Sequence, residues 1–257
     1  MKKQPIFRFY WFGTCLRYLQ DASTQHRVHG DDHVLANFKM FFVFLDDLSL
    51  AVTRRVVENK LSGIREELES ADEGAALTPG QAKSIGSAMS EIRTTLDAEL
   101  QGVYAYTPTP KRLELSSLLE NVKALFAPGV YIQMPQIAQN DFAGAGRCIA
   151  FEIPTAAAFH LMRGTEAVLR FYYNEMVRQK RVSSKNWGPI IADLRVRVRT
   201  RNYEALNNHL DNIRVSFRNP TQHPDAEYDI HEVQDLYSIC IDVVNRMVKT
   251  LRKEGKL

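Results

Sequence analysis

The sequence has no run of apolar residues long enough to cross a membrane. A membrane-spanning helix needs about 20 apolar residues, and the longest apolar run here, residues 40–45, ends at Asp46 and Asp47. Near the beginning, Arg8 and Arg17 interrupt an aromatic stretch and no small-residue cleavage site follows, so we expect no signal peptide. These absences predict a cytoplasmic protein without a membrane partner.

Cysteine is scarce as well. The three cysteines, Cys15, Cys148 and Cys240, are far apart in the sequence and form no Cys-x-x-Cys pair. A disulfide framework uses an even set of cysteines, and a zinc ribbon uses closely spaced pairs. The composition therefore argues against both classes and is typical of a protein from a reducing compartment.

The motifs of metal and nucleotide sites are incomplete. His26, His29 and His33 have a spacing that would let three imidazoles meet on a helix and bind a metal. Gly30 and the polar residues around it instead favour a loop, and a metal-dependent hydrolase at these histidines is only an alternative. Residues 144–146 read Gly-Ala-Gly, but neither a preceding strand nor a following Gly-Lys-Ser/Thr completes a nucleotide-binding loop. We therefore expect no metal and no cofactor.

Apolar residues recur at steps of three and four along most of the chain, which is the period of an amphipathic helix. This pattern predicts an all-α fold. Residues 5–20 fit either a short strand or a helix, and residues 128–148 are expected to be irregular. The predicted helices cover residues 33–69, 81–104, 112–126, 155–178, 187–198, 203–217 and 230–251.

A stiff Thr-Pro-Thr-Pro segment at residues 107–110 separates two parts of the chain. We place a domain boundary there, with an N-terminal helical region at 1–110 and a helical bundle at 111–257. Within the first region, the short polar connector at residues 70–80 predicts that the helices on either side form an antiparallel hairpin. No motif in this region indicates its function.

Basic charge is concentrated in one stretch, although the formal net charge of the chain is only +3. Residues 178–201 carry eight basic side chains and a single acidic one, Asp193. Such a block can attract a polyanion and release its counterions, which makes RNA a candidate partner; a solvated loop and helix end is the alternative. The eight residues of this basic block are Arg178, Lys180, Arg181, Lys185, Arg195, Arg197, Arg199 and Arg201.

Three side chains with useful chemistry lie within the six residues 218–223. Arg218 can bind a phosphate through paired hydrogen bonds, and His223 can accept or donate a proton near neutral pH. Asn219 offers an amide beside them. This set suffices for metal-free cleavage of RNA, in which the ribose 2′-hydroxyl is the nucleophile. The alternative is that these residues cap the two flanking helices.

The turn and an upstream helix together resemble the HEPN superfamily (higher eukaryotes and prokaryotes nucleotide-binding domains). The resemblance is carried by Arg-Asn-x-x-x-His at 218–223 and by Ala-Ala-Phe-His-x-x-Arg-x-x-Glu-Ala-Val-Leu-Arg at 157–170, and it covers about residues 150–252. It implies an up-and-down four-helix bundle, here with an N-terminal helical-hairpin extension. It also implies a homodimer that brings two Arg/His turns into one cleft.

For function, the resemblance implies a metal-independent endoribonuclease of a bacterial defence or toxin–antitoxin system. Arg218 would bind the scissile phosphate, His223 would transfer a proton, Asn219 would assist, and Glu166 would orient Arg218. An antitoxin or another defence protein is the implied partner, besides RNA. The alternative is a catalytically silent HEPN scaffold that binds a partner protein, a nucleotide or RNA.

Overall fold

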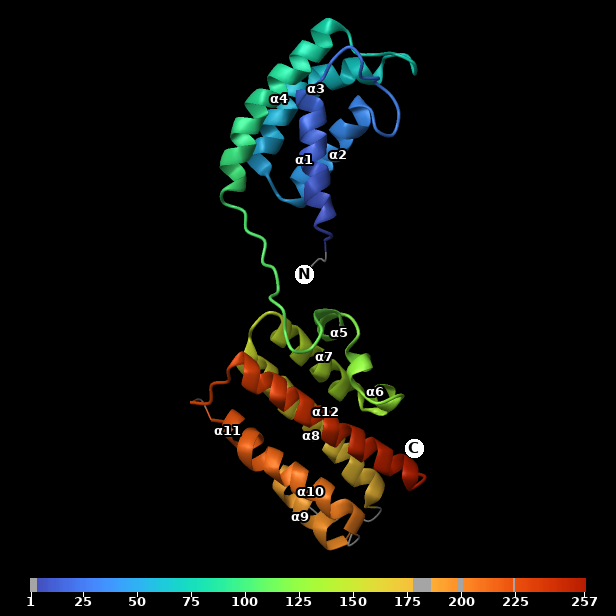
Figure 1. The fold of residues 1–257 in the computed structure, drawn as a ribbon, viewed down its shortest axis with the longest axis vertical. Coiled ribbons are helices and arrows are strands. Elements are labelled where there is room, and N and C mark those ends of the chain that lie inside the picture. Colours follow the sequence, from blue (N-terminus) through green and yellow to red (C-terminus); the bar gives the residue numbers. More distant parts are fainter. Residues whose placement is uncertain (1–3, 178–185, 198–200, 224) are drawn as a thin grey trace. The chain divides into compact units, whose positions relative to one another are not determined.

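Helices are the regular secondary structure of the residues that the protein's structure, a computed structural model, describes. Within them the chain forms helices and no strand, so the prediction of an all-α fold is confirmed. The chain divides into two compact units, Met1–Tyr106 and Thr107–Leu257 (Figure 1). No helix of the described part is both long and apolar enough to cross a membrane. The described residues are 4–177, 186–197, 201–223 and 225–257, without the side chains of residues 201 and 202.

The described part of the first unit packs four helices around an apolar core of its own. The segment 5–20, which fits a strand or a helix by sequence, forms a helix from Phe7 onwards. The single helix expected at 33–69 is wrong, because the chain breaks at Ser49, whose φ is +57°. A residue with left-handed backbone does not continue a right-handed helix. The four helices are α1 (Phe7–Gln20), α2 (Val34–Asp47), α3 (Ala51–Glu69) and α4 (Pro79–Leu100).

The loop between α1 and α2 holds the three histidines that a metal could have used. The side chains of two of them bind separate partners: Nδ1 of His26 lies 2.9 Å from Oγ of Ser23, and Nε2 of His29 lies 2.8 Å from the carbonyl oxygen of Ala71. Across the described ranges, no group of three or more His, Cys, Asp or Glu side chains is placed to hold a metal ion. The geometry therefore does not support a metal site at these histidines.

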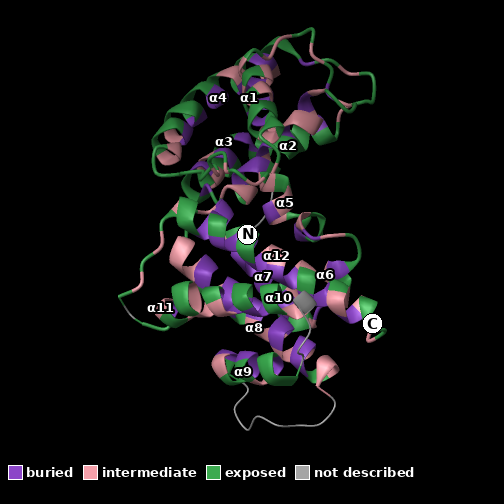
Figure 2. Cartoon of the chain, turned by 60° about the horizontal axis from the view of Figure 1, so that its bottom comes forward, coloured by how far each residue is buried: buried purple, intermediate pink, exposed green. Residues whose placement is uncertain are grey.

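The second unit is organised around helix α8 (Pro154–Met176), which contacts α7, α9, α11 and α12. Figure 1 shows α8 and α12 side by side, and Figure 2 shows the buried positions that these helices share. Ala157 and Ala158 of α8 are fully buried, which allows this close packing. The other elements are α5 (Leu115–Leu119), η1 (Val122–Leu125), α6 (Val130–Gln133), α7 (Gln136–Ala150), α9 (Trp187–Arg197), α10 (Arg201–Ile213), η2 (Arg214–Arg218), α11 (Asn219–Thr221) and α12 (Ile230–Lys253).

Helix α7 occupies much of the segment that we expected to be irregular, so that expectation is wrong. Its glycines mark positions where other parts of the chain come very close. A Cβ on Gly146 would lie 2.5 Å from the carbonyl oxygen of Leu118, and one on Gly144 would lie 3.0 Å from the ring of His160. Glycine lowers helix propensity by about 1 kcal/mol, which this close packing outweighs. The single helix expected at 112–126 is likewise two shorter pieces, α5 and η1.

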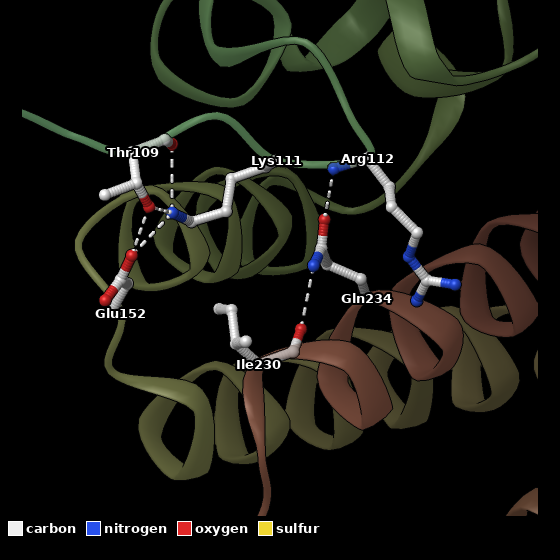
Figure 3. A network of polar contacts seen from close by, with 6 residues as sticks. All are labelled: Thr109, Lys111, Arg112, Glu152, Ile230 and Gln234. Atoms are coloured by element: carbon white, nitrogen blue, oxygen red, sulfur yellow. Dashed lines mark hydrogen bonds and ion pairs between the residues drawn. The ribbon is translucent and has the colours of Figure 1, made fainter.

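Polar contacts hold the beginning of the second unit against its helices (Figure 3). The side chain of Lys111 is only 3% exposed, and its Nζ lies 2.7 Å from Oε1 of Glu152. The backbone N–H of Arg112 donates to Oε1 of Gln234 (2.9 Å). Gln234 is buried and donates in turn to the carbonyl oxygen of Ile230 (2.9 Å). These bonds satisfy polar groups that would otherwise be buried without partners.

Candidate functional site

A groove of about 990 Å³ runs along one side of α8 in the second unit. Its size falls within the range of small-molecule sites. Its lining combines exposed apolar surface, such as Phe159, with charged side chains that recur at steps of three and four along the helix. We call it the α8 groove; the lining residues that bear on its chemistry are Phe159, His160, Arg163, Glu166, Arg170, Arg218 and Gln222.

The turn that supplies Arg218 and Gln222 is more helical than the sequence indicated. We expected a helix that ends at Phe217, but the backbone continues from α10 through the π-helical turn η2 and into α11. Pro220 is tolerated there because it lies in the first turn of α11, where a backbone N–H has no helical partner. Single π-helical turns are often found at functional sites, and Arg218 is the last residue of this one.

A buried hydroxyl holds this turn in place. Oγ1 of Thr221 donates to the carbonyl oxygen of Phe217 (2.7 Å) and lies 2.7 Å from the hydroxyl of Tyr228. The hydroxyl of Tyr228 also lies 3.3 Å from the same carbonyl oxygen. Thr221 is fully buried. The turn η2, the end of α11 and the segment before α12 are therefore tied together next to Arg218.

Glu166 lies between two arginines of the α8 groove. Its Oε2 is 3.6 Å from an Nη atom of Arg218, and its Oε1 forms an ion pair with Arg170, one turn further along α8. The Nε atoms of both arginines are buried and have no hydrogen-bond partner among the described residues. Glu166 thus lies within ion-pair distance of both guanidinium groups.

A second polar cluster in the groove centres on Asp141 of α7, which is 1% exposed. Arg163 donates to both of its carboxylate oxygens (2.8 and 2.5 Å), and Nδ1 of His160 lies 2.9 Å from Oδ1. Burial alone would raise the pKa of Asp141, but the hydrogen bonds from Arg163 and His160 outweigh it and lower this pKa below the ordinary value. Asp141 is therefore ionised at neutral pH.

Sequence reasoning did not single out Asp141. A signal was present, because Asp141 lies three residues after Ala138 and four before Ala145, on the stripe of small residues that α7 buries. An acidic residue within a buried stripe needs a partner. The position of Asp141 on a buried stripe can be recognised only once residues 136–150 are assigned to a helix.

Asn219 and His223 are exposed and do not line the α8 groove, although Gln222 between them does. The backbone N–H of His223 donates to the carbonyl oxygen of Pro220 (2.8 Å). Within the described part of the chain, the His223 side chain makes no hydrogen bond or ion pair. Helix α12 is capped by Asp229, whose carboxylate accepts from the backbone N–H groups of its first turn. The alternative in which His223 caps that helix is therefore wrong.

Only two side chains of the basic block are described, and both are exposed but paired. An Nη atom of Arg195 lies 3.1 Å from Asp211, and Nε of Arg197 lies 2.7 Å from Asp193. The remaining members lie outside the described residues or side chains: Arg178, Lys180, Arg181, Lys185, Arg199 and Arg201.

Comparisons with protein-family models, with curated proteins and with solved structures find no match to this chain. The chemistry of the α8 groove and of the adjoining turn is therefore what bears on function. Three arginines line the groove, Arg163, Arg170 and Arg218, and they outnumber Glu166 in the lining together with Asp141, which is buried behind it. This excess of fixed positive charge suits an anionic ligand.

Proposed function

We propose that the chain is a metal-independent endoribonuclease of the HEPN type, which cleaves RNA at the turn formed by residues 218–223. The observation that carries the proposal is the position of Arg218. It lies beside Glu166 in the α8 groove, at the end of a π-helical turn, and five residues before the exposed His223. A permanent cation in the groove and a titratable imidazole on the adjoining turn are thus available.

In this proposal, Arg218 binds the scissile phosphate and offsets the charge that develops on its oxygens. The ribose 2′-oxygen attacks phosphorus, the 5′-oxygen leaves, and a 2′,3′-cyclic phosphate remains. His223 transfers a proton during this step, and Asn219 assists at the phosphate. The basic block at 178–201 steers RNA towards the site.

A second copy of the chain would place another 218–223 turn opposite the first, as in the dimeric four-helix bundles of the HEPN superfamily. The exposure of Asn219 and His223 is compatible with such a shared cleft. A role in bacterial defence or toxicity, controlled by an antitoxin-like partner, belongs to the same proposal.

Cleavage of RNA in the presence of a metal chelator tests the proposal. We expect the wild-type protein to cut and to leave 2′,3′-cyclic phosphate ends. His223→Ala should lower the rate by about 100-fold or more, the usual contribution of a general acid or base. Arg218→Ala should also lower it by about 100-fold or more, the usual cost of removing a donor that stabilises developing charge.

Two variants serve as matched controls. Arg214 lies one turn before Arg218 and pairs with Asp211 (2.8 Å) outside the groove, and His231 is an exposed histidine at the first turn of α12. Arg214→Ala and His231→Ala should cut at about the wild-type rate. If Arg218→Ala and His223→Ala cut RNA as fast as the wild type, the proposal is wrong.

The second candidate function is a catalytically silent HEPN-type protein that binds a partner protein, a nucleotide or RNA. It is favoured by the ion pair with Glu166, which partly neutralises Arg218, and by the position of His223 outside the groove lining. Wild-type protein that binds RNA in the chelated assay without cutting it would support this candidate. Arg218→Ala should then weaken binding, whereas His223→Ala should not.

A further inference from the structure

His160, which lines the α8 groove, forms a histidine–aspartate pair with Asp141, and the proposed role of the turn at 218–223 does not involve this pair. Asp141 is almost fully buried behind the groove, whereas His160 is about one-third exposed and lines it. The pair joins residues of α7 and α8 that are 19 positions apart. Arg163 binds the same carboxylate through two further hydrogen bonds, so that Asp141 is held rigidly.

The geometry of the pair sets the tautomer of His160. An ionised carboxylate can only accept hydrogen bonds. Because Asp141 is ionised, Nδ1 of His160 carries the hydrogen atom of their 2.9 Å bond. In the neutral imidazole, Nε2 then holds a free lone pair. A carboxylate that orients a histidine through a hydrogen bond to one ring nitrogen is a common feature of acid–base sites.

The missing side chain of Gly144 makes room for the imidazole ring of His160. A Cβ at this position would lie 3.0 Å from both Nδ1 and Cε1 of His160 and 3.2 Å from Cγ. The edge of the ring that carries Nδ1 therefore rests on the backbone of α7. Within the described residues, Nε2 of His160 has no hydrogen-bond partner, and the ring belongs to the lining that also holds Arg170 and Arg218.

RNA cleavage by a 2′-hydroxyl needs two proton transfers, one from the nucleophile and one to the leaving oxygen. The 218–223 turn contains a single imidazole, His223. The α8 groove contains an imidazole that is already oriented, His160, and Arg218 of the turn lines the same groove.

We propose that His160 is a second catalytic residue of the groove and that Asp141 is its positioning residue. This inference rests on the proposed ribonuclease function. Nε2 of neutral His160 accepts the proton of the 2′-hydroxyl as the 2′-oxygen bonds to phosphorus. The bond from phosphorus to the 5′-oxygen breaks, and the imidazolium form of His223 donates a proton to that oxygen. Arg218 binds the phosphate during this step.

The first test is the chelated RNA-cleavage assay with His160→Asn. The asparagine amide can still donate to Asp141 in place of Nδ1, but Nε2 is lost. We expect the rate to fall by about 100-fold or more. The matched control is His209→Asn, because His209 also lies near an aspartate, with Nδ1 3.6 Å from Asp242, but outside the groove lining. This control should cut at about the wild-type rate.

The second test follows the histidine ring nitrogens of the full chain by ¹⁵N NMR. Wild-type His160 should show the tautomer with hydrogen on Nδ1, and its Nε2 signal should move when uridine 3′-monophosphate is added, while the signals of His209 stay in place. Asp141→Asn should abolish the preference for this tautomer, a change that a purely structural role of Asp141 in packing would not produce.

The outcomes separate this inference from the proposed function. If the wild type cuts RNA, His223→Ala does not, and His160→Asn cuts at the wild-type rate, then only the role of His160 is wrong. If the Nε2 signal of His160 does not move when uridine 3′-monophosphate is added, the inference is wrong as well. If the wild type cuts no RNA, the proposed function and the proton-transfer role both fall, and the titration alone shows whether His160 contacts a phosphate ligand.

Discussion

At the scale of single residues, Asp141 accepts hydrogen bonds from two side chains, although no sequence motif marked it. It is a buried carboxylate that accepts from one arginine and one histidine, and both partners reach the α8 groove. Removing one partner of a buried ion pair leaves the remaining charged groups without a partner. This loss lowers the free energy of unfolding by more than the intact pair adds to it. Asp141 therefore has a role in stability that can be measured apart from any activity.

We expect Asp141→Asn to lower the free energy of unfolding by about 2 kcal/mol at pH 7, because hydrogen bonds to charged groups contribute about 1.5–3 kcal/mol. The folded-state pKa of Asp141 is lowered. Its stabilisation is thus fully present above the unfolded pKa of about 3.9 and is lost as the pH falls through the folded pKa. Denaturant unfolding at several pH values should show a difference from wild type that shrinks below about pH 4.

Asp242 offers a matched control for this prediction. It too lies near one arginine and one histidine, 2.7 Å from Nε of Arg246 and 3.6 Å from Nδ1 of His209, but its side chain is 47% exposed. Exposed ion pairs contribute little, so Asp242→Asn should change the free energy of unfolding by less than about 0.5 kcal/mol. Equal effects of the two substitutions would contradict the importance of burial at Asp141.

At the scale of elements, α7 shows how glycine can support a helix. Its Gly146 lets the α5 backbone approach, since a Cβ there would lie 2.5 Å from the carbonyl oxygen of Leu118. Backbone atoms cannot move aside as the end of a flexible side chain can. The packing of α7 against α5 therefore depends on the absence of a side chain at position 146 more than on the helix propensity of glycine.

We expect Gly146→Ala to lower the free energy of unfolding of the second unit by about 1–3 kcal/mol, the usual cost of overpacking. Gly63, inside α3, is the control, because a Cβ there would meet nothing within 4 Å. Gly63→Ala should stabilise the first unit by about 0.5–1 kcal/mol. Denaturant unfolding followed by circular dichroism measures both, and a stabilising Gly146→Ala would show that α5 can shift freely.

At the scale of the whole molecule, the two units have separate apolar cores. The buried residues of the first core lie between Phe12 and Leu96, and those of the second between Leu118 and Leu251. Between the cores, residues 103–110 form no helix or strand, and Tyr104 and Tyr106 are 77% and 89% exposed. Exposed segments without secondary structure are preferred sites of proteolysis.

Brief digestion with chymotrypsin should therefore cut first after Tyr104 or Tyr106 and yield two fragments that are each helical by circular dichroism. Each fragment should unfold cooperatively, because each keeps its own core. A variant with Tyr104→Ser and Tyr106→Ser should resist this first cut. Fragments that lose their helical signal after cleavage would show that the units do not fold on their own.

The sequence by itself determined the helical class and the local spacing of the site. The period of three and four along α8 placed His160, Arg163, Glu166 and Arg170 on one side of a helix, and the structure shows all four lining one groove. This worked because the face of a helix depends only on residues within one turn of each other. The HEPN resemblance and the roles that it implies for Asn219 and His223 stay predictions.

Only the tertiary structure decided which distant residues meet. The contacts of Asp141 with His160 and of Glu166 with Arg218 join residues 19 and 52 positions apart, which no local period encodes. The same holds for α7, whose glycines resemble loop residues until the α5 backbone and the His160 ring are placed beside them. Close packing between helices, rather than local propensity, therefore determined that this segment is helical and that Asp141 meets His160.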